Sequence, residues 1–325
     1  MNVIRRSPIA NLATLAVIVA ATAARAHFAP LPAEAFADTP TFLGALLGGW
    51  QTMYPVATLC AACAVWFAAG WTIGLVVKVR ELYFIRTTIT IPIYGFAACG
   101  LLFAHDYLAA SAASLLFAVA MRSYIDSYRD GYGFSPIFFG SLCLGLLPLI
   151  YAPAVALLAL MPLAVIIFKR SAREAIVAVA GMLLAPLAVS YICWGAGGDF
   201  ATPVMQSIEA LTAVSGYRFF GAVTAGEAVL ACTLLALVLG AAFISSANVY
   251  SMNTRARFIT LYNLCAFAVA LATLAMPSST ATAFGLIAVP TAMAVPVMLV
   301  QIREQAAAAI YGGLALLFVL HLVIA

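Results

Sequence analysis

Long apolar stretches separated by short polar segments are the feature that most constrains the fold of this chain. Ten of the eleven stretches contain no Asp, Glu, Lys or Arg, and the first contains only Arg25. A helix needs about 17 to 25 apolar residues to cross a bilayer, and fewer where it is short or broken. The predicted spans are 9–26, 56–77, 89–104, 107–121, 135–150, 154–168, 175–194, 228–244, 259–275, 281–300 and 306–325.

The apolar stretches favour helices over a β-barrel. Barrel strands alternate apolar and polar residues, whereas Leu142 to Ile150 and Leu157 to Phe168 are apolar without alternation. Only 8% of the residues are charged and 66% are hydrophobic, against about 25% charged in a typical soluble domain. We therefore predict an all-α polytopic transmembrane protein with about 11 spans. Residues 1–325 form a single integral membrane domain, with no soluble domain.

Basic residues predict the orientation, because Lys and Arg in short loops stay on the cytoplasmic side. With a cytoplasmic N-terminus, thirteen of the fifteen Lys and Arg residues fall inside, and only Arg25 and Arg218 fall outside. The inner segments carry a charge of +8 and the outer segments −4, which together give the net charge of +4. This places the loops 122–134 and 169–174 in the cytoplasm and residues 195–227 outside.

The first span has a second interpretation as a signal peptide. Arg5 and Arg6 precede a short apolar core, and Ala24-Arg25-Ala26 matches a small-residue cleavage site. A chain with ten further spans does not need a removable signal, so we favour an uncleaved first helix. The remaining topology is the same in both cases.

Two outer segments have the pattern of amphipathic helices. Thr202 is predicted to cap a helix whose first turn carries Pro203, and Val204, Ile208, Leu211 and Ser215 follow helical spacing. The first outer loop ends similarly, in an apolar segment from Phe42 to Trp50. Both are expected to lie on the outer leaflet.

The chain lacks the common motifs of enzymes and cofactor-binding proteins. It contains no Gly-rich phosphate loop with its Lys, no HExxH, no GxSxG and no DxD. Cys60 and Cys63 have CxxC spacing, but they lie in a predicted span without nearby His or acidic residues, so we interpret them as packing residues. No cofactor, metal site or nucleic-acid partner is predicted.

Charged residues are also missing from the middle of every predicted span. Ion-coupled transporters usually keep such a residue at mid-membrane, where it binds or relays the ion. His321 is the one ionisable residue deep in a span, and it lies close to the chain end. A coupled transporter is therefore disfavoured, and facilitation without coupling stays open.

Glu34 and Asp38 in the first outer loop are the candidate catalytic residues. Membrane glycosyltransferases of the C type, which use polyprenyl-phosphate sugars, place an essential acidic residue in this loop. A carboxylate there can deprotonate an acceptor hydroxyl or hold a metal ion beside the donor phosphate. The alternative, which we favour, is a solvated loop that follows the charge bias.

Arg122 and Arg129 are the candidate lipid headgroup-binding residues. They flank a loop rich in tyrosine, and a guanidinium fork matches the oxygens of a lipid phosphate. The same side chains also serve as anchors for the adjoining helix ends, and we favour anchoring for these residues and for the cluster at 169–174.

The middle of the chain resembles a known family. The residues that carry the likeness are mainly Gly, Pro and Arg-Glu positions, with apolar residues between them: Phe138, Gly140, Leu144, Gly145, Leu146, Leu149, Tyr151-Ala152-Pro153, Pro162, Ile167, Phe168, Arg170, Arg173, Glu174, Gly181 and Pro186. Over residues 80–195 this pattern resembles an uncharacterised family of Bacteroidota polytopic inner-membrane proteins, domain of unknown function 6427. The resemblance implies a Gram-negative inner membrane and no known activity, substrate or catalytic residue.

The sequence alone predicts an integral inner-membrane protein, with envelope lipid or glycan handling as its favoured setting. Its expected partners are the lipid bilayer and a polyprenyl phosphate or other envelope lipid; the sequence identifies no protein partner. The first alternative is a C-type glycosyltransferase that uses a lipid-linked sugar at the outer face. The others are a non-catalytic subunit of a membrane complex and a lipid flippase.

Overall fold

The computed structural model describes residues 7–28, 41–80, 87–98, 106–128, 132–213, 225–247 and 252–324. Within these ranges the regular elements are all helices: α2 (Pro8–Phe28), α3 (Phe42–Met53), α4 (Pro55–Arg80), α5 (Thr90–Ala97), α6 (Tyr107–Ser127), α7 (Phe134–Ile150), η2 (Ala152–Ala159), α8 (Leu160–Ile167), α9 (Ala172–Gly195), α10 (Thr202–Thr212), α12 (Ala225–Ala247), α13 (Thr254–Ala272), η3 (Thr273–Ala275), α14 (Thr282–Gln301) and α15 (Glu304–Ile324). The all-α prediction is confirmed.

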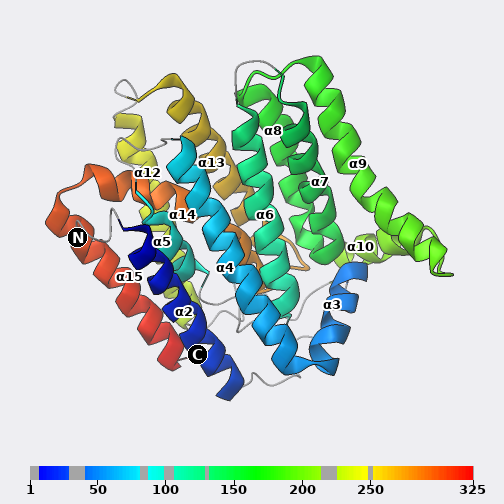
Figure 1. Cartoon of the computed structure of the whole chain (residues 1–325), viewed down its shortest axis with the longest axis horizontal. Helices are drawn as coiled ribbons and strands as arrows, with labels where there is room; N and C mark the ends of the chain where they lie inside the picture. The colour runs from blue at the N-terminus through cyan, green and yellow to red at the C-terminus, as the bar shows by residue number, and fades with distance from the viewer. Residues whose placement is uncertain are drawn as a thin grey trace.

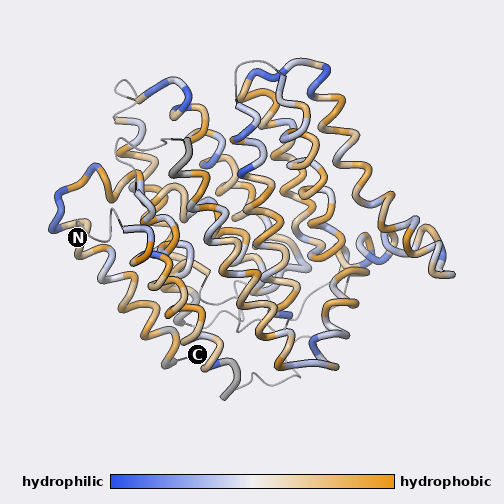
Figure 2. Tube along the Cα trace, in the orientation of Figure 1, coloured by the Kyte–Doolittle hydropathy of each residue, from blue (hydrophilic) through white to orange (hydrophobic). Residues whose placement is uncertain are grey.

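The helices lie side by side, with α2 and α15 at one edge of the bundle and α9 at the other (Figure 1). Among the described residues, seven helices are long and apolar enough to cross a membrane: α2, α4, α6, α9, α12, α13 with η3, and α14. The tube in Figure 2 is apolar along most of the helix lengths. Large apolar side chains such as Leu183 and Ile192 on α9 and Phe243 on α12 are exposed. This surface is suited to lipid, so the chain is a multi-pass membrane protein.

The other four predicted spans are shorter or irregular. Span 89–104 contains the eight-residue α5, and residues 99–105 lie outside the described part. Span 154–168 begins as the 3-10 helix η2 and continues as α8, and Pro162 lacks the N–H that a continuous α-helix would bond to the carbonyl of Leu158. Spans 135–150 and 306–325 correspond to α7 and α15. The helix of the fourth span continues beyond the predicted span end at 121, to Ser127.

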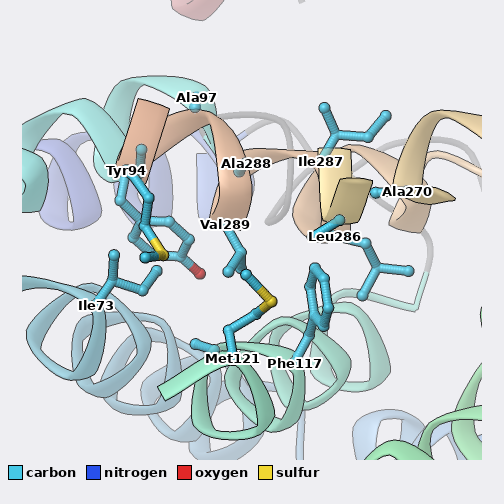
Figure 3. Close-up of a cluster of buried hydrophobic side chains, with 14 of the residues drawn as sticks. Ile73, Tyr94, Ala97, Phe117, Met121, Ala270, Leu286, Ile287, Ala288 and Val289 are labelled. Atoms are coloured by element: carbon cyan, nitrogen blue, oxygen red, sulfur yellow. The ribbon is translucent and has the colours of Figure 1, made fainter. Parts of the chain in front are cut away.

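Helix α14 is the centre of the bundle. Its residues from Thr282 to Leu299 are all buried, as expected of a helix that is apolar on every side. Figure 3 shows its segment from Leu286 to Val289 facing Phe117 and Met121 of α6, with Tyr94 of α5 beside them. Ser114 of α6 donates to the carbonyl of Gly285 (3.0 Å) and bonds the Tyr94 hydroxyl (2.7 Å), which ties α5, α6 and α14 together.

Glycines allow the helices to approach closely. A Cβ at Gly70 would lie 2.7 Å from Leu15 of α2, and one at Gly74 would overlap Ile91 of α5. Helices α7 and α9 touch through their backbones: a Cβ at Gly145 would meet the carbonyl of Met182, and one at Gly181 would lie 2.6 Å from the carbonyl of Phe138. The close contact expected of small residues in membrane helices is therefore present.

One end of the bundle, which we call the acidic end, carries the two amphipathic helices. Helices α3 and α10 contact each other there. Helix α3 also contacts α6 and α7, and α10 contacts η2 and α7. Thr41 caps α3 and its hydroxyl donates to the carbonyl of Ile150, the last residue of α7 (2.8 Å). Asp106, Asp199 and Glu209 lie at this end, and apolar side chains such as Trp50 and Ile208 are exposed on the two helices.

The start of α10 differs from the prediction by one residue. Ala201 occupies the cap position with a helical backbone (φ −79°, ψ −20°), and Thr202 is already in the first turn. The turn that begins at Asp199 reaches helical geometry early, because the N–H of Thr202 bonds the Asp199 carbonyl (3.2 Å). Ser215 lies outside the described residues.

Candidate functional site: a basic and aromatic cluster

The opposite end of the bundle, the basic end, contains a cluster of cationic and aromatic side chains. It is formed where α6 and α8 end and where α9 and α13 begin. We call it the basic–aromatic cluster; its members are Tyr128, Phe168, Lys169, Arg170, Arg255 and Phe258.

The turn between α8 and α9 exposes Lys169. The N–H of Lys169 bonds the carbonyl of Ile166 (3.1 Å), and the N–H of Arg170 bonds that of Val165 (2.9 Å). These two bonds form a Schellman motif, which usually has glycine at the position held here by Lys169. Lys169 adopts a left-handed backbone with φ of 51°, which costs about 1–2 kcal/mol for a residue with a Cβ. A strained position occupied by lysine favours a role for its side chain.

The ring of Tyr128 is the centre of the cluster. Phe168 and Phe258 contact it, with centroids 5.3 and 6.0 Å away. The guanidinium carbons of Arg255 and Arg170 lie 5.4 and 5.9 Å from its centroid, within the range of a cation–π interaction. Arg255 also donates to the Tyr128 carbonyl. The ring therefore holds two guanidinium groups from different parts of the chain.

Glu174 neutralises only one of the cations. Its carboxylate lies 3.3 Å from Arg170, and both side chains are buried, with 3% and 7% of their surface exposed. It also accepts bonds from the N–H groups of Gly133 (2.7 Å) and Ser171 (3.0 Å) and from the Ser171 hydroxyl (2.9 Å). Lys169 and Arg255 are exposed, and within the described part of the chain neither forms an ion pair.

Among the described residues, the cluster thus presents two cations without a carboxylate partner, next to three aromatic rings. The Nζ of Lys169 lies 5.5 Å from the centroid of Phe258, which is three residues after Arg255 on α13. An ammonium and a guanidinium held in this way can bind a phosphate group by charge-assisted hydrogen bonds. The rings suit the headgroup region of a membrane, where aromatic side chains concentrate.

Of the candidate site residues predicted from the sequence, only Arg122 lies in the described part of the chain. Arg122 pairs with Asp126 one turn along α6, 3.7 Å away, in a partly exposed ion pair. Arg129, Glu34 and Asp38 lie outside the described residues. The glycosyltransferase alternative depends on the last two, so it stays a hypothesis, as do the subunit and flippase alternatives.

In the sequence, Arg255 is one of the thirteen basic residues assigned to the inner side, and Phe258 belongs to no motif. Both lie in the first turns of α13, three residues apart and therefore on one helix face. That spacing is a weak signal by itself. The two side chains become part of a site because α13 places them against Tyr128, at the end of α6. For the cysteines, Cys60 and Cys63 are both free thiols on α4. The described residues contain no group of three or more His, Cys, Asp or Glu side chains that could hold a metal ion.

Comparison of the chain with protein-family models, with curated proteins and with solved structures finds no match. The resemblance over residues 80–195 stays a prediction.

Proposed function

We propose that this protein is an integral inner-membrane protein of a bacterium that binds a phosphate-bearing lipid of the envelope at its cytoplasmic face. The observation that carries the proposal is the basic–aromatic cluster, in which Lys169 and Arg255 lack a carboxylate partner among the described residues. Anionic lipid attracts each such cation by about 1 kcal/mol near the membrane surface. A phospholipid and a polyprenyl phosphate share the phosphate group that this site would recognise.

The proposal includes eleven crossings with a cytoplasmic N-terminus. Contacts between helix ends support the eleven crossings, since each joins segments that an eleven-span topology assigns to one side, and the basic residues support the orientation. The pairs on the inner side are Asn11 with Thr88, Gly133 with Glu174, and Tyr128 with Arg255. The pairs on the outer side are Arg25 with Leu322, Thr41 with Ile150, Pro55 with Tyr107, and Tyr151 with Thr280.

The lipid-binding experiment compares variants that remove one cation each. Lys169→Gly removes the ammonium and places the preferred residue at a left-handed position, so the variant should be at least as stable as the wild type. Arg255→Gln removes the second exposed cation. Each should weaken binding of phosphatidylglycerol or of a polyprenyl phosphate about five-fold, and the double variant about 30-fold, if each charge contributes about 1 kcal/mol.

Native mass spectrometry of the detergent-purified protein, titrated separately with the two lipids, measures these affinities. Arg303→Gln is the matched control, because it removes an exposed arginine that is not part of the cluster. Weakening for only one lipid would identify the ligand. Equal affinities in the wild type, both cluster variants and the control would refute the proposal.

A further inference from the structure

A small cavity lies between α12, α13 and α14. Ala241 and Ser245 of α12, Thr260 and Asn263 of α13, and Met293 and Val297 of α14 line it. Its volume is about 10 Å³, which is close to the space that one water molecule requires. None of the lining residues carries a charge, so a neutral occupant fits.

Asn263 leaves an acceptor unused at this cavity. Its side chain is 4% exposed, and its Nδ2 donates to the carbonyl of Pro290 on α14 (2.9 Å). A carbonyl can only accept, so this bond fixes which end of the amide is nitrogen. The remaining atom, Oδ1, is buried and has no hydrogen-bond partner among the described residues.

Thr260 contributes a second unused group. Several threonines in the other helices donate to a carbonyl one turn back, as Thr72 does to Ala68, Thr233 to Val229 and Thr291 to Ile287. The hydroxyl of Thr260 is buried and has no partner in the described part of the chain. Thr260 and Asn263 are three residues apart on one face of α13, and both line the same cavity.

We infer that this cavity binds one water molecule, which accepts from the Thr260 hydroxyl and donates to Oδ1 of Asn263. Its second hydrogen can reach the oxygen of Ser245, which itself donates to the Ala241 carbonyl (2.7 Å). Three hydrogen bonds are typical of a buried water. The water removes the penalty of unpaired polar groups inside the bundle and connects the three helices next to Pro290, whose missing N–H interrupts the bonding of α14.

Thr260→Val tests the inference, because valine keeps the shape of threonine and lacks the hydroxyl. With a bound water, the substitution removes one of its bonds, and the unfolding temperature of the purified protein should fall by about 2 °C or more. In a dry cavity, it would delete an unpaired buried hydroxyl, and the unfolding temperature would rise. Thr260→Ser keeps the hydroxyl and should lie closer to the wild type than Thr260→Val.

Thr233→Val on α12 is the matched control, since its hydroxyl is exposed and already bonds its own helix. A density map at about 2 Å resolution supplies the second measurement. A peak at hydrogen-bond distance, about 2.7–3.2 Å, from both Thr260 Oγ1 and Asn263 Oδ1 would support the inference. An empty cavity, or an unfolding temperature that rises or stays unchanged in Thr260→Val, would overturn it.

Discussion

At the scale of single residues, Glu174 holds the basic end together. Its carboxylate joins the cap of α9, the guanidinium of Arg170 and the N–H of Gly133 just before α7. Glu174→Ala should lower the free energy of unfolding by about 3–5 kcal/mol, because it removes the carboxylate that pairs with the buried Arg170. Glu174→Gln should cost less, since it retains one acceptor oxygen. Denaturant unfolding in detergent, followed by circular dichroism, measures both.

Glu209 on α10 provides the control for this experiment, because its side chain is exposed at the acidic end. Glu209→Ala should change the free energy of unfolding by no more than about 0.5 kcal/mol. If Glu174→Ala were as small in effect as Glu209→Ala, the carboxylate of Glu174 would have no part in stabilising Arg170.

At the scale of elements, the contact of α7 with α9 depends on two glycines. Gly145 faces the backbone of Met182, and Gly181 faces that of Phe138, so each helix offers a glycine to the carbonyl of the other. Gly145→Ala should destabilise the protein by about 1–3 kcal/mol, because a backbone carbonyl cannot move aside as a flexible side chain can. The same unfolding measurement applies.

Gly312→Ala on α15 is the matched control, since a Cβ there meets nothing within 4 Å. Alanine is the better helix former by about 1 kcal/mol, so this variant should be neutral or more stable. Equal destabilisation at the two positions would mean that the loss comes from the glycine backbone and not from the contact between α7 and α9.

At the scale of the whole molecule, charge separates the two ends of the bundle. Arg173 and Asp199 stand at opposite ends of the 24-residue α9, about 36 Å long at 1.5 Å per residue, which is enough to cross a bilayer. In a cysteine-free variant, Asp199→Cys should react with a membrane-impermeant maleimide from the periplasm. Arg173→Cys should react only after the membrane is permeabilised. Labelling of both from one side would contradict a crossing by α9, and exchanged results would reverse the orientation.

Local properties of the sequence were enough to predict helices, their approximate ends and the two amphipathic segments. An apolar run and a cap are properties of neighbouring residues, and they act before any tertiary contact forms. The interruption of span 154–168 by η2 was missed, because a proline permits either a kink or a 3-10 turn and packing selects between them.

The site itself was decided by the tertiary structure. Tyr128, Arg170 and Arg255 are distant in sequence, and they meet only because α6, α8 and α13 end or begin at the same end of the bundle. The left-handed backbone of Lys169 and the unpaired atoms of Thr260 and Asn263 likewise have no local sequence signature. The sequence could not predict these features for a physical reason. Hydropathy determines whether a helix enters the membrane, whereas side-chain packing between helices selects its neighbours.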